Sequence, residues 1–132
     1  MLAVYLVNMK DLIILVADYN TKFLLEGLLP RVHSIENTKK FIFEIFVHPY
    51  RDPGVFNGAH EFLRAYTSKY QYAITIFDHE GSGQEHLSRE IIEEKVEEKL
   101  KNNGWSNDRA IAVVVKPEIE NWIWVKSLHL KN

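Results

Sequence analysis

Cysteine is absent from this chain of 132 residues, and neither sign of charge dominates it. Without cysteine there is no disulfide framework, no thiolate zinc site and no thiol nucleophile. The 16 lysines and arginines and the 18 acidic residues leave a net charge of −2. No strong overall field therefore draws the chain to nucleic acid or to an anionic membrane. Glycine and proline number only 6 and 4, which excludes a collagen-like chain.

Long hydrophobic runs are also missing. The two apolar runs near the start, Met1–Val7 and Leu12–Ala17, are separated by Lys10 and Asp11. Each is far shorter than the roughly 20 residues that a membrane-spanning helix needs. No basic segment precedes the first run, so a secretory signal is not expected. These features predict a soluble, cytoplasmic protein without a membrane partner, in which residues 1–8 are either an N-terminal extension or a short extra strand.

Hydrophobic residues make up 46% of the chain and charged residues 26%, as in ordinary globular proteins. The length suits one domain over residues 1–132. Four stretches have the length and pattern of a strand: Leu12–Ala17, Lys40–Val47, Tyr72–Phe77 and Ala110–Val115. The first is apolar at every position, whereas the second places Phe41, Phe43, Ile45 and Val47 on one face and includes Glu44 on the other. Runs that are apolar at every position are typical of strands buried on both faces of a parallel sheet.

Helical patterns separate these strands. The first helix carries apolar residues at helical spacing between Phe23 and Leu29, with Asp18 or Asn20 as N-cap, and Pro30 at or just beyond its end. In the second, Asp52 is the expected N-cap and Pro53 the first helical residue.

The third helix should end at Gly104, and its N-cap is either Ser88 or Ser82 in a capping box with Glu85. Its expected buried stripe is Leu87, Ile91, Ile92, Val96 and Leu100. Its charged side, from Glu93 to Lys99, is expected to face solvent.

The alternation of strands and helices predicts an α/β fold with three layers, α/β/α, around a mostly parallel four-stranded sheet. A last amphipathic segment begins at Pro117 and includes Trp122 and Trp124. These tryptophans are expected to pack on the sheet, or else to anchor an interface.

Polar residues follow the strands, at the edge where open α/β sheets bind ligands. Asp18 follows the first strand, and Asp78 and Glu80 follow the third. Clustered carboxylates repel one another unless a hard cation lies between them, so Asp18, Asp78 and Glu80 are a candidate Mg²⁺ or Mn²⁺ site. The alternative is that these acids cap helices.

Other polar residues complete this candidate site. His48 and Arg51 follow the second strand, and Lys116, Glu118 and Glu120 follow the fourth. The turn Gly81-Ser82-Gly83 leaves room for a phosphate, with the start of the third helix as a further source of N–H donors. It is neither a P-loop nor a nucleophile elbow.

The string Asp78-x-Glu80-x-x-Gly83 resembles the Asp-x-Asp-x-x-Gly motif of Toprim domains, which are Mg²⁺-binding α/β folds. Those domains end their first strand with Glu, where this chain has Asp18. Longer strings, including His48-Pro49-x-Arg51-Asp52-Pro53-Gly54 and Pro117-Glu118-x-Glu120-x-Trp122, resemble prokaryotic methylation-associated defence proteins. The resemblance implies a Toprim-like protein with a role in antiviral (phage) defence.

Three functions remain open at this stage. The first is a Mg²⁺-dependent phosphoryl-transfer enzyme or nuclease. In it Glu118 or Glu120 would orient a water, His48 would act as acid or base, and Arg51, Lys116 and the glycine turn would bind phosphate. The second is a non-catalytic subunit that binds a nucleotide, a nucleic acid or other defence proteins, either alone or as an oligomer. The third is a structural module in which the acids serve only as caps.

Overall fold

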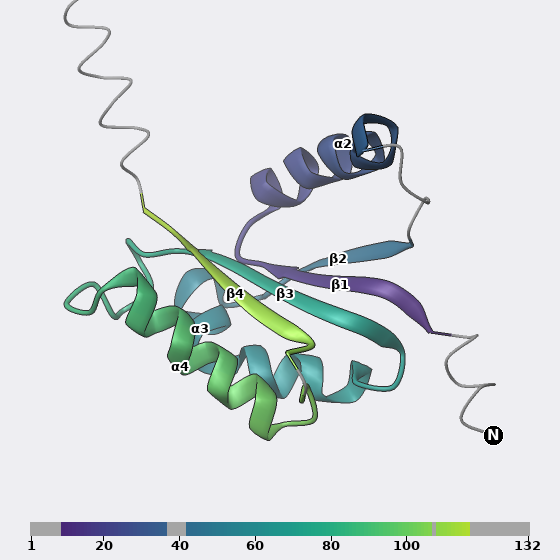
Figure 1. Cartoon of the computed structure of the whole chain (residues 1–132). Helices are drawn as coiled ribbons and strands as arrows, with labels where there is room; N and C mark the ends of the chain where they lie inside the picture. The colour runs from purple at the N-terminus through teal and green to yellow at the C-terminus, as the bar shows by residue number, and fades with distance from the viewer. Residues whose placement is uncertain (1–8, 37–41, 107, 117–132) are drawn as a thin grey trace, which may run out of the picture.

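The computed structural model describes residues 9–36, 42–106 and 108–116, and in them the chain has an α/β fold (Figure 1). The strands are β1 (Lys10–Val16), β2 (Phe43–Val47), β3 (Tyr70–Asp78) and β4 (Ala110–Val115). The helices are α2 (Tyr19–Glu36), α3 (Arg51–Leu63) and α4 (Arg89–Asn102), and a 3₁₀ turn, η1 (Arg64–Tyr66), follows α3. The predictions for residues 1–8, for Lys40 and for the segment from Pro117 lie outside the described residues.

The sheet has the strand order β2-β1-β3-β4, and every pairing in the described part is parallel. Helix α2 lies on one side of the sheet, where it packs on β1 and β2. Helices α3 and α4 lie on the other side, α3 against β1 and β3, and α4 against β4 (Figure 1). The predicted three-layer α/β/α architecture is therefore confirmed.

The central strand β1 divides the core into two parts. Ile13 and Leu15 are fully buried in the larger cluster, on the side of α3 and α4. Ile14 and Val16 point the opposite way, toward α2, where Leu25 and Leu29 pack against them. This alternation explains why the strand is apolar at every one of these positions.

Trp105 and Arg109 hold the connection between α4 and β4 against the rest of the fold. The fully buried Trp105 donates its indole N–H to the carbonyl oxygen of Leu63 at 3.2 Å. The Arg109 guanidinium lies over the Trp105 ring and donates to three backbone carbonyls, those of Thr67, Tyr70 and Gln71. These bonds tie the start of β4 to the start of β3.

The first helix is longer than predicted, because it continues through Pro30 to Glu36. An interior proline removes the N–H that would bond to the carbonyl four residues earlier. Pro30 and Glu26 are both exposed, so water can reach this turn and take the lost bond. No helix in the described part of the chain combines the length and apolar character needed to cross a bilayer.

One predicted helix cap is wrong and another is confirmed. Helix α3 begins at Arg51 and has no side-chain cap at Tyr50. Asp52 does not cap it, because its carboxylate accepts instead from the backbone N–H of Asp78 at 2.8 Å. Helix α4 is capped by Ser88, whose hydroxyl accepts from the Ile91 N–H, so the alternative capping box at Ser82 does not form.

The charged side of α4 is not wholly solvated, contrary to prediction. The Glu93 carboxylate accepts from the N–H of Val114 at 2.9 Å, and the Glu97 carboxylate accepts from the N–H of Ala112 at 3.0 Å. Both N–H groups lie on the outer side of β4, the edge strand of the described sheet. Two glutamates therefore satisfy an edge that would otherwise offer free donors. Ile91, predicted to be buried, is 44% exposed.

This arrangement predicts a difference between neighbouring glutamates of α4. Glu93→Ala and Glu97→Ala should each lower the free energy of unfolding by roughly 1–3 kcal/mol, because each leaves a strand N–H without its charged acceptor. Glu94→Ala and Glu98→Ala remove the same charge from exposed positions and should change it by less than about 0.5 kcal/mol. Urea denaturation of the four variants checks this, and equal effects would contradict the edge role.

Candidate functional site

The carboxyl ends of all four described strands meet at one edge of the sheet. Val16 pairs in register with Val47 of β2 and with Ile76 of β3, and Asp78 pairs with Val115 of β4. Asp18 and His48, which follow β1 and β2, and Asp78, the last residue of β3, therefore lie at the same edge, as the sequence predicts.

A polar crevice of about 490 Å³ opens at this edge, beside β1 and β2. This volume lies in the range usual for small-molecule sites. Its lining consists of Ala17, Asp18, Tyr19, Asn20, Val47, His48, Pro49 and Arg51. The structure thus brings Asp18, His48 and Arg51 together, and it adds Asn20, which the sequence suggested only as an alternative cap.

Asp18 is the N-cap of α2. One of its carboxylate oxygens accepts from the backbone N–H of Thr21 at 2.7 Å, and its carbonyl accepts from the N–H of Lys22. The cap explanation therefore holds for this acid. Capping places the carboxylate at the positive end of the α2 dipole, at the rim of the crevice.

His48 is a buried, neutral histidine. Its side chain packs on Phe62 and against the glycines of α3, where a Cβ on Gly54 would lie only 2.5 Å from Nδ1. Nδ1 accepts a hydrogen bond from the Tyr50 N–H at 3.1 Å, so this nitrogen carries no proton. Burial lowers the pKa of the His48 imidazole below its ordinary value of 6.5. This environment suits a positioning role for His48 in the loop before α3.

Arg51 is the most unusual residue of the crevice. Its backbone φ is +57°, in the left-handed region that side chains other than glycine, asparagine and aspartate rarely adopt. Its N–H donates to the carbonyl of His48 at 3.2 Å, which helps to hold this turn. The guanidinium is exposed, and no carboxylate among the described residues forms an ion pair with it. Strained residues of this kind gather at functional sites.

The predicted phosphate turn is occupied by the chain's own carboxylate. Gly81 and Gly83 both have positive φ, +89° and +84°, and their N–H groups donate to Glu85 at 2.9 and 3.3 Å. The hydrogen bonds from the backbone N–H groups of Glu85 itself, Gly81 and Gly83 lower the pKa of the Glu85 carboxyl. Ser82 is buried and donates to the carbonyl of His79. A phosphate at this turn would have to displace Glu85.

The predicted metal ligands lie at the same edge but form no ready cage. Within the described ranges, no three histidine or acidic side chains are grouped so that they could hold a metal ion. Glu80 is exposed, and the N–H of Asp78 is held by Asp52. Glu118 and Glu120 lie outside the described residues.

Lys116 does not line the crevice. It lies close enough to α4 to act on Glu90, whose pKa is lowered by a hydrogen bond from its own backbone N–H and then by the charges of Arg89 and Lys116. Asp52 and Glu85 also lie at this edge, where their carboxylates accept from backbone N–H groups of β3 and the glycine turn. The sequence did not predict these contacts. The Asp-Pro and Ser-x-x-Glu patterns favoured helix caps for both, and only the folded chain shows which N–H groups they reach.

The family resemblance stays a prediction. The motif residues Asp78, Glu80 and Gly83 lie at or just after the carboxyl end of β3. Comparison of the chain with protein-family models, with curated proteins and with solved structures found no match.

The burial of His48 predicts how stability changes with pH. Because the folded state binds the imidazole proton more weakly than the unfolded chain does, protonation favours unfolding. The free energy of unfolding should fall as the pH drops below about 6.5, the ordinary value. His48→Asn keeps an acceptor for the Tyr50 N–H and should lose less stability between pH 7.5 and 5.5 than the wild type. Urea denaturation at both pH values measures this, and equal slopes would contradict it.

Proposed function

We propose that the crevice beside β1 and β2 binds a phosphate-bearing small molecule, most simply a nucleotide, as a binding subunit of a prokaryotic defence complex in the cytoplasm. The observation that carries this proposal is Arg51. It is held in a strained backbone conformation at the rim of the crevice, and its guanidinium has no ion-pair partner in the described part of the chain. A guanidinium is the side chain best suited to bind phosphate through two parallel hydrogen bonds.

The other polar groups of the crevice suit the rest of a nucleotide. Asp18 offers a carboxylate that can accept from sugar hydroxyls or base amino groups, and Asn20 offers both a donor and an acceptor. The neutral His48 adds no charge. The negative charge of Asp18 and the positive charge of Arg51 offset each other in the crevice. It should therefore prefer a ligand that has both an anionic group and hydrogen-bond donors to a simple anion.

A second candidate is Mg²⁺-dependent phosphoryl transfer, and the placement of Asp18 and Asp78 favours it. Asp18 lies two residues after Val16, and Asp78 lies two residues after Ile76, the in-register partner of Val16. Glu80 follows Asp78 by two residues. Mg²⁺ commonly uses only one or two carboxylates and completes its coordination with waters and substrate phosphate. In this proposal Asp18, Asp78 and Glu80 would hold the ion, Arg51 would bind the phosphate, and Glu118 or Glu120 would orient a water.

The binding proposal predicts a specific dependence on Arg51. Isothermal titration with ATP and with AMP, each without metal, should give a measurable affinity for the wild type. Arg51→Asn should weaken it at least tenfold, because the charge-assisted contact is lost while asparagine tolerates the left-handed backbone. Arg31→Gln removes a positive charge from an exposed position on α2 and serves as the control. No binding by the wild type at millimolar ligand, or equal binding by Arg51→Asn, would contradict the proposal.

The metal proposal is tested separately with Mn²⁺ and with Mg²⁺-ATP. If it is right, Asp78→Asn should abolish the binding of Mn²⁺ and any gain in ATP affinity with Mg²⁺, while metal-free binding of AMP stays unchanged. Glu26→Gln, on the exposed side of α2, serves as the control. A wild type that binds ATP equally with and without Mg²⁺, and binds no Mn²⁺ at millimolar concentration, would exclude this candidate and leave the nucleotide proposal standing.

A further inference from the structure

No described helix covers the half of the sheet formed by β3 and β4 on the side of α2 (Figure 1). Helix α2 packs on β1 and β2 and leaves the same face of β3 and β4 open. Four apolar side chains on that face are at least a third exposed: Tyr72, Ile111, Val113 and Val115. The described residues form a complete layer on one side of the sheet and half a layer on the other.

The two faces of β4 show the difference directly. Ala112 and Val114 point toward α4 and are 5% and 1% exposed, whereas Ile111 and Val113 point the other way and are 47% and 37% exposed. Both sets are equally apolar, and a parallel strand with this composition is normally covered on both faces. Helix α2 also carries exposed apolar residues, Phe23, Leu24 and Leu28, which are about half exposed or more. A patch of this extent marks a place where something packs.

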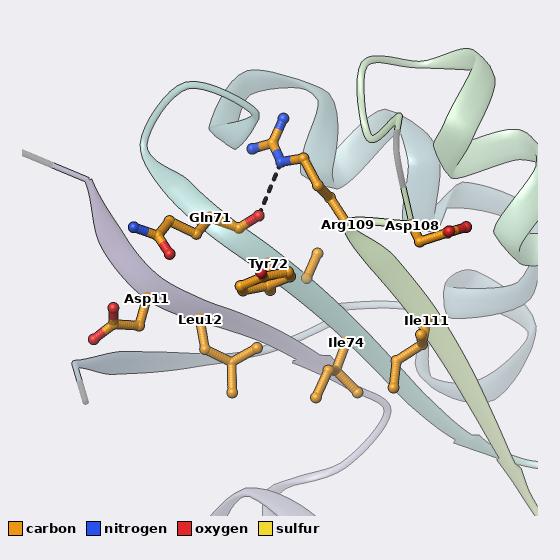
Figure 2. Close-up of a pocket in the computed structure, with 9 residues that line it drawn as sticks. Asp11, Leu12, Gln71, Tyr72, Ile74, Asp108, Arg109 and Ile111 are labelled. Atoms are coloured by element: carbon orange, nitrogen blue, oxygen red, sulfur yellow. Dashed lines mark hydrogen bonds between the residues drawn. The ribbon is translucent and has the colours of Figure 1, made fainter. Parts of the chain in front are cut away.

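The open face is hollowed. Figure 2 shows the hollow, which has a volume of about 440 Å³. Leu12, Tyr72, Ile74 and Ile111 contribute the apolar side chains of its lining. Polar residues from the amino-terminal ends of β1 and β4 also line it: Asp11, Asp108 and Arg109. Arg109 keeps its positive charge while it donates to three backbone carbonyls, and the Asp11 carboxylate accepts from the Ile42 N–H at 2.7 Å. This end of the hollow therefore carries two negative charges and one positive charge.

The outer edge of β4 is closed to an added strand. The carboxylates of Glu93 and Glu97 already accept from the N–H groups of Val114 and Ala112. A further strand pairing with β4 would have to break both bonds. An additional element must therefore lie on the face of the sheet.

We propose that residues 117–132 of this same chain are the element that covers the open half of the sheet. They follow β4 at the carboxyl edge, where α4 already occupies the other face of β4. Sixteen residues are enough to cross the roughly 20 Å length of a six-residue strand such as β4 in any regular conformation. The segment is rich in large apolar residues: Ile119, Trp122, Ile123, Trp124, Val125, Leu128 and Leu130.

The basic residues of this segment match the direction that the proposal requires. Leaving the carboxyl edge, it must run back toward the amino-terminal ends of the strands. Its later basic residues, Lys126 and Lys131, would then approach the end of the hollow that carries Asp11 and Asp108. Its acidic residues, Glu118 and Glu120, would stay at the edge that holds Asp78, where carboxylates repel one another unless a cation lies between them. Only Lys126 and Lys131 therefore favour this direction.

The experiment uses the absence of cysteine, which allows a single thiol to be placed without background. Ile111→Cys puts a thiol on the open face, and Ile91→Cys puts one on α4 as a control, since the two isoleucines are similarly exposed at 47% and 44%. In the full chain, Ellman's reagent should react with Ile111→Cys at least tenfold more slowly than with Ile91→Cys. Equal rates would overturn the proposal.

A second variant identifies the occupant. Adding Trp122→Ser and Trp124→Ser to Ile111→Cys should restore fast labelling while the circular dichroism of the fold is kept. Slow labelling that survives these changes but is relieved by dilution would point to a second copy of the chain. Slow labelling that survives at every concentration would point to residues 1–8. Either result overturns the assignment to residues 117–132.

A further measurement keeps the test decisive if the tryptophan variant does not fold. The chain has three tryptophans, and Trp105 is buried in the core on the side of α4, away from the open face. A change in tryptophan fluorescence after a substitution on the open face therefore reports on Trp122 and Trp124. Ile111→Asp should shift the tryptophan emission to longer wavelength and increase acrylamide quenching, and Ile91→Asp should do neither. Unchanged emission in Ile111→Asp would overturn the proposal.

Discussion

The parallel pairing of β1 with β2 on one side and with β3 on the other is the constraint on which the rest of the structure depends. It buries Ile13, Ile14, Leu15 and Val16 almost completely, and each face of the strand serves a different part of the core. Because neighbouring strands run in the same direction, their carboxyl ends meet at one edge. The crevice, Asp78 and the glycine turn all lie at that edge as a consequence.

Carboxylates in this fold act repeatedly as acceptors for backbone N–H groups. Asp18 caps α2, Asp52 holds the N–H of Asp78, and Glu85 closes the glycine turn. Glu93 and Glu97 do the same for the edge of β4. An acid that satisfies a buried or strand-edge donor has a structural reason to be there. Arg51 has no comparable structural contact for its charge in the described residues, which is why the proposed function is centred on it.

The two faces of the sheet differ in how far their apolar side chains are covered by the described residues. On the side of α3 and α4, the apolar residues of β3 and β4 are covered, and Arg109 and Trp105 hold the connection into β4 in place. On the side of α2, equally apolar residues of the same strands remain exposed in the described part. The cost of exposing so much apolar surface is the physical reason for the proposal that the segment following β4 covers this face.

The sequence by itself determined the α/β class, the four strands and their parallel arrangement, because strand-length apolar runs and helical spacing are local patterns that burial imposes. It also placed Asp18, His48, Arg51 and Asp78 at one edge, since chain direction alone requires this. Only the tertiary structure decided which donor each acid meets. Asp52 turned from its expected cap to Asp78, 26 residues away, and Glu97 reached a strand rather than solvent. Such choices depend on distances between elements that no local pattern contains. Likewise, the neutral state of His48 and the strained backbone of Arg51 arise from how the loop before α3 packs on Gly54 and Phe62.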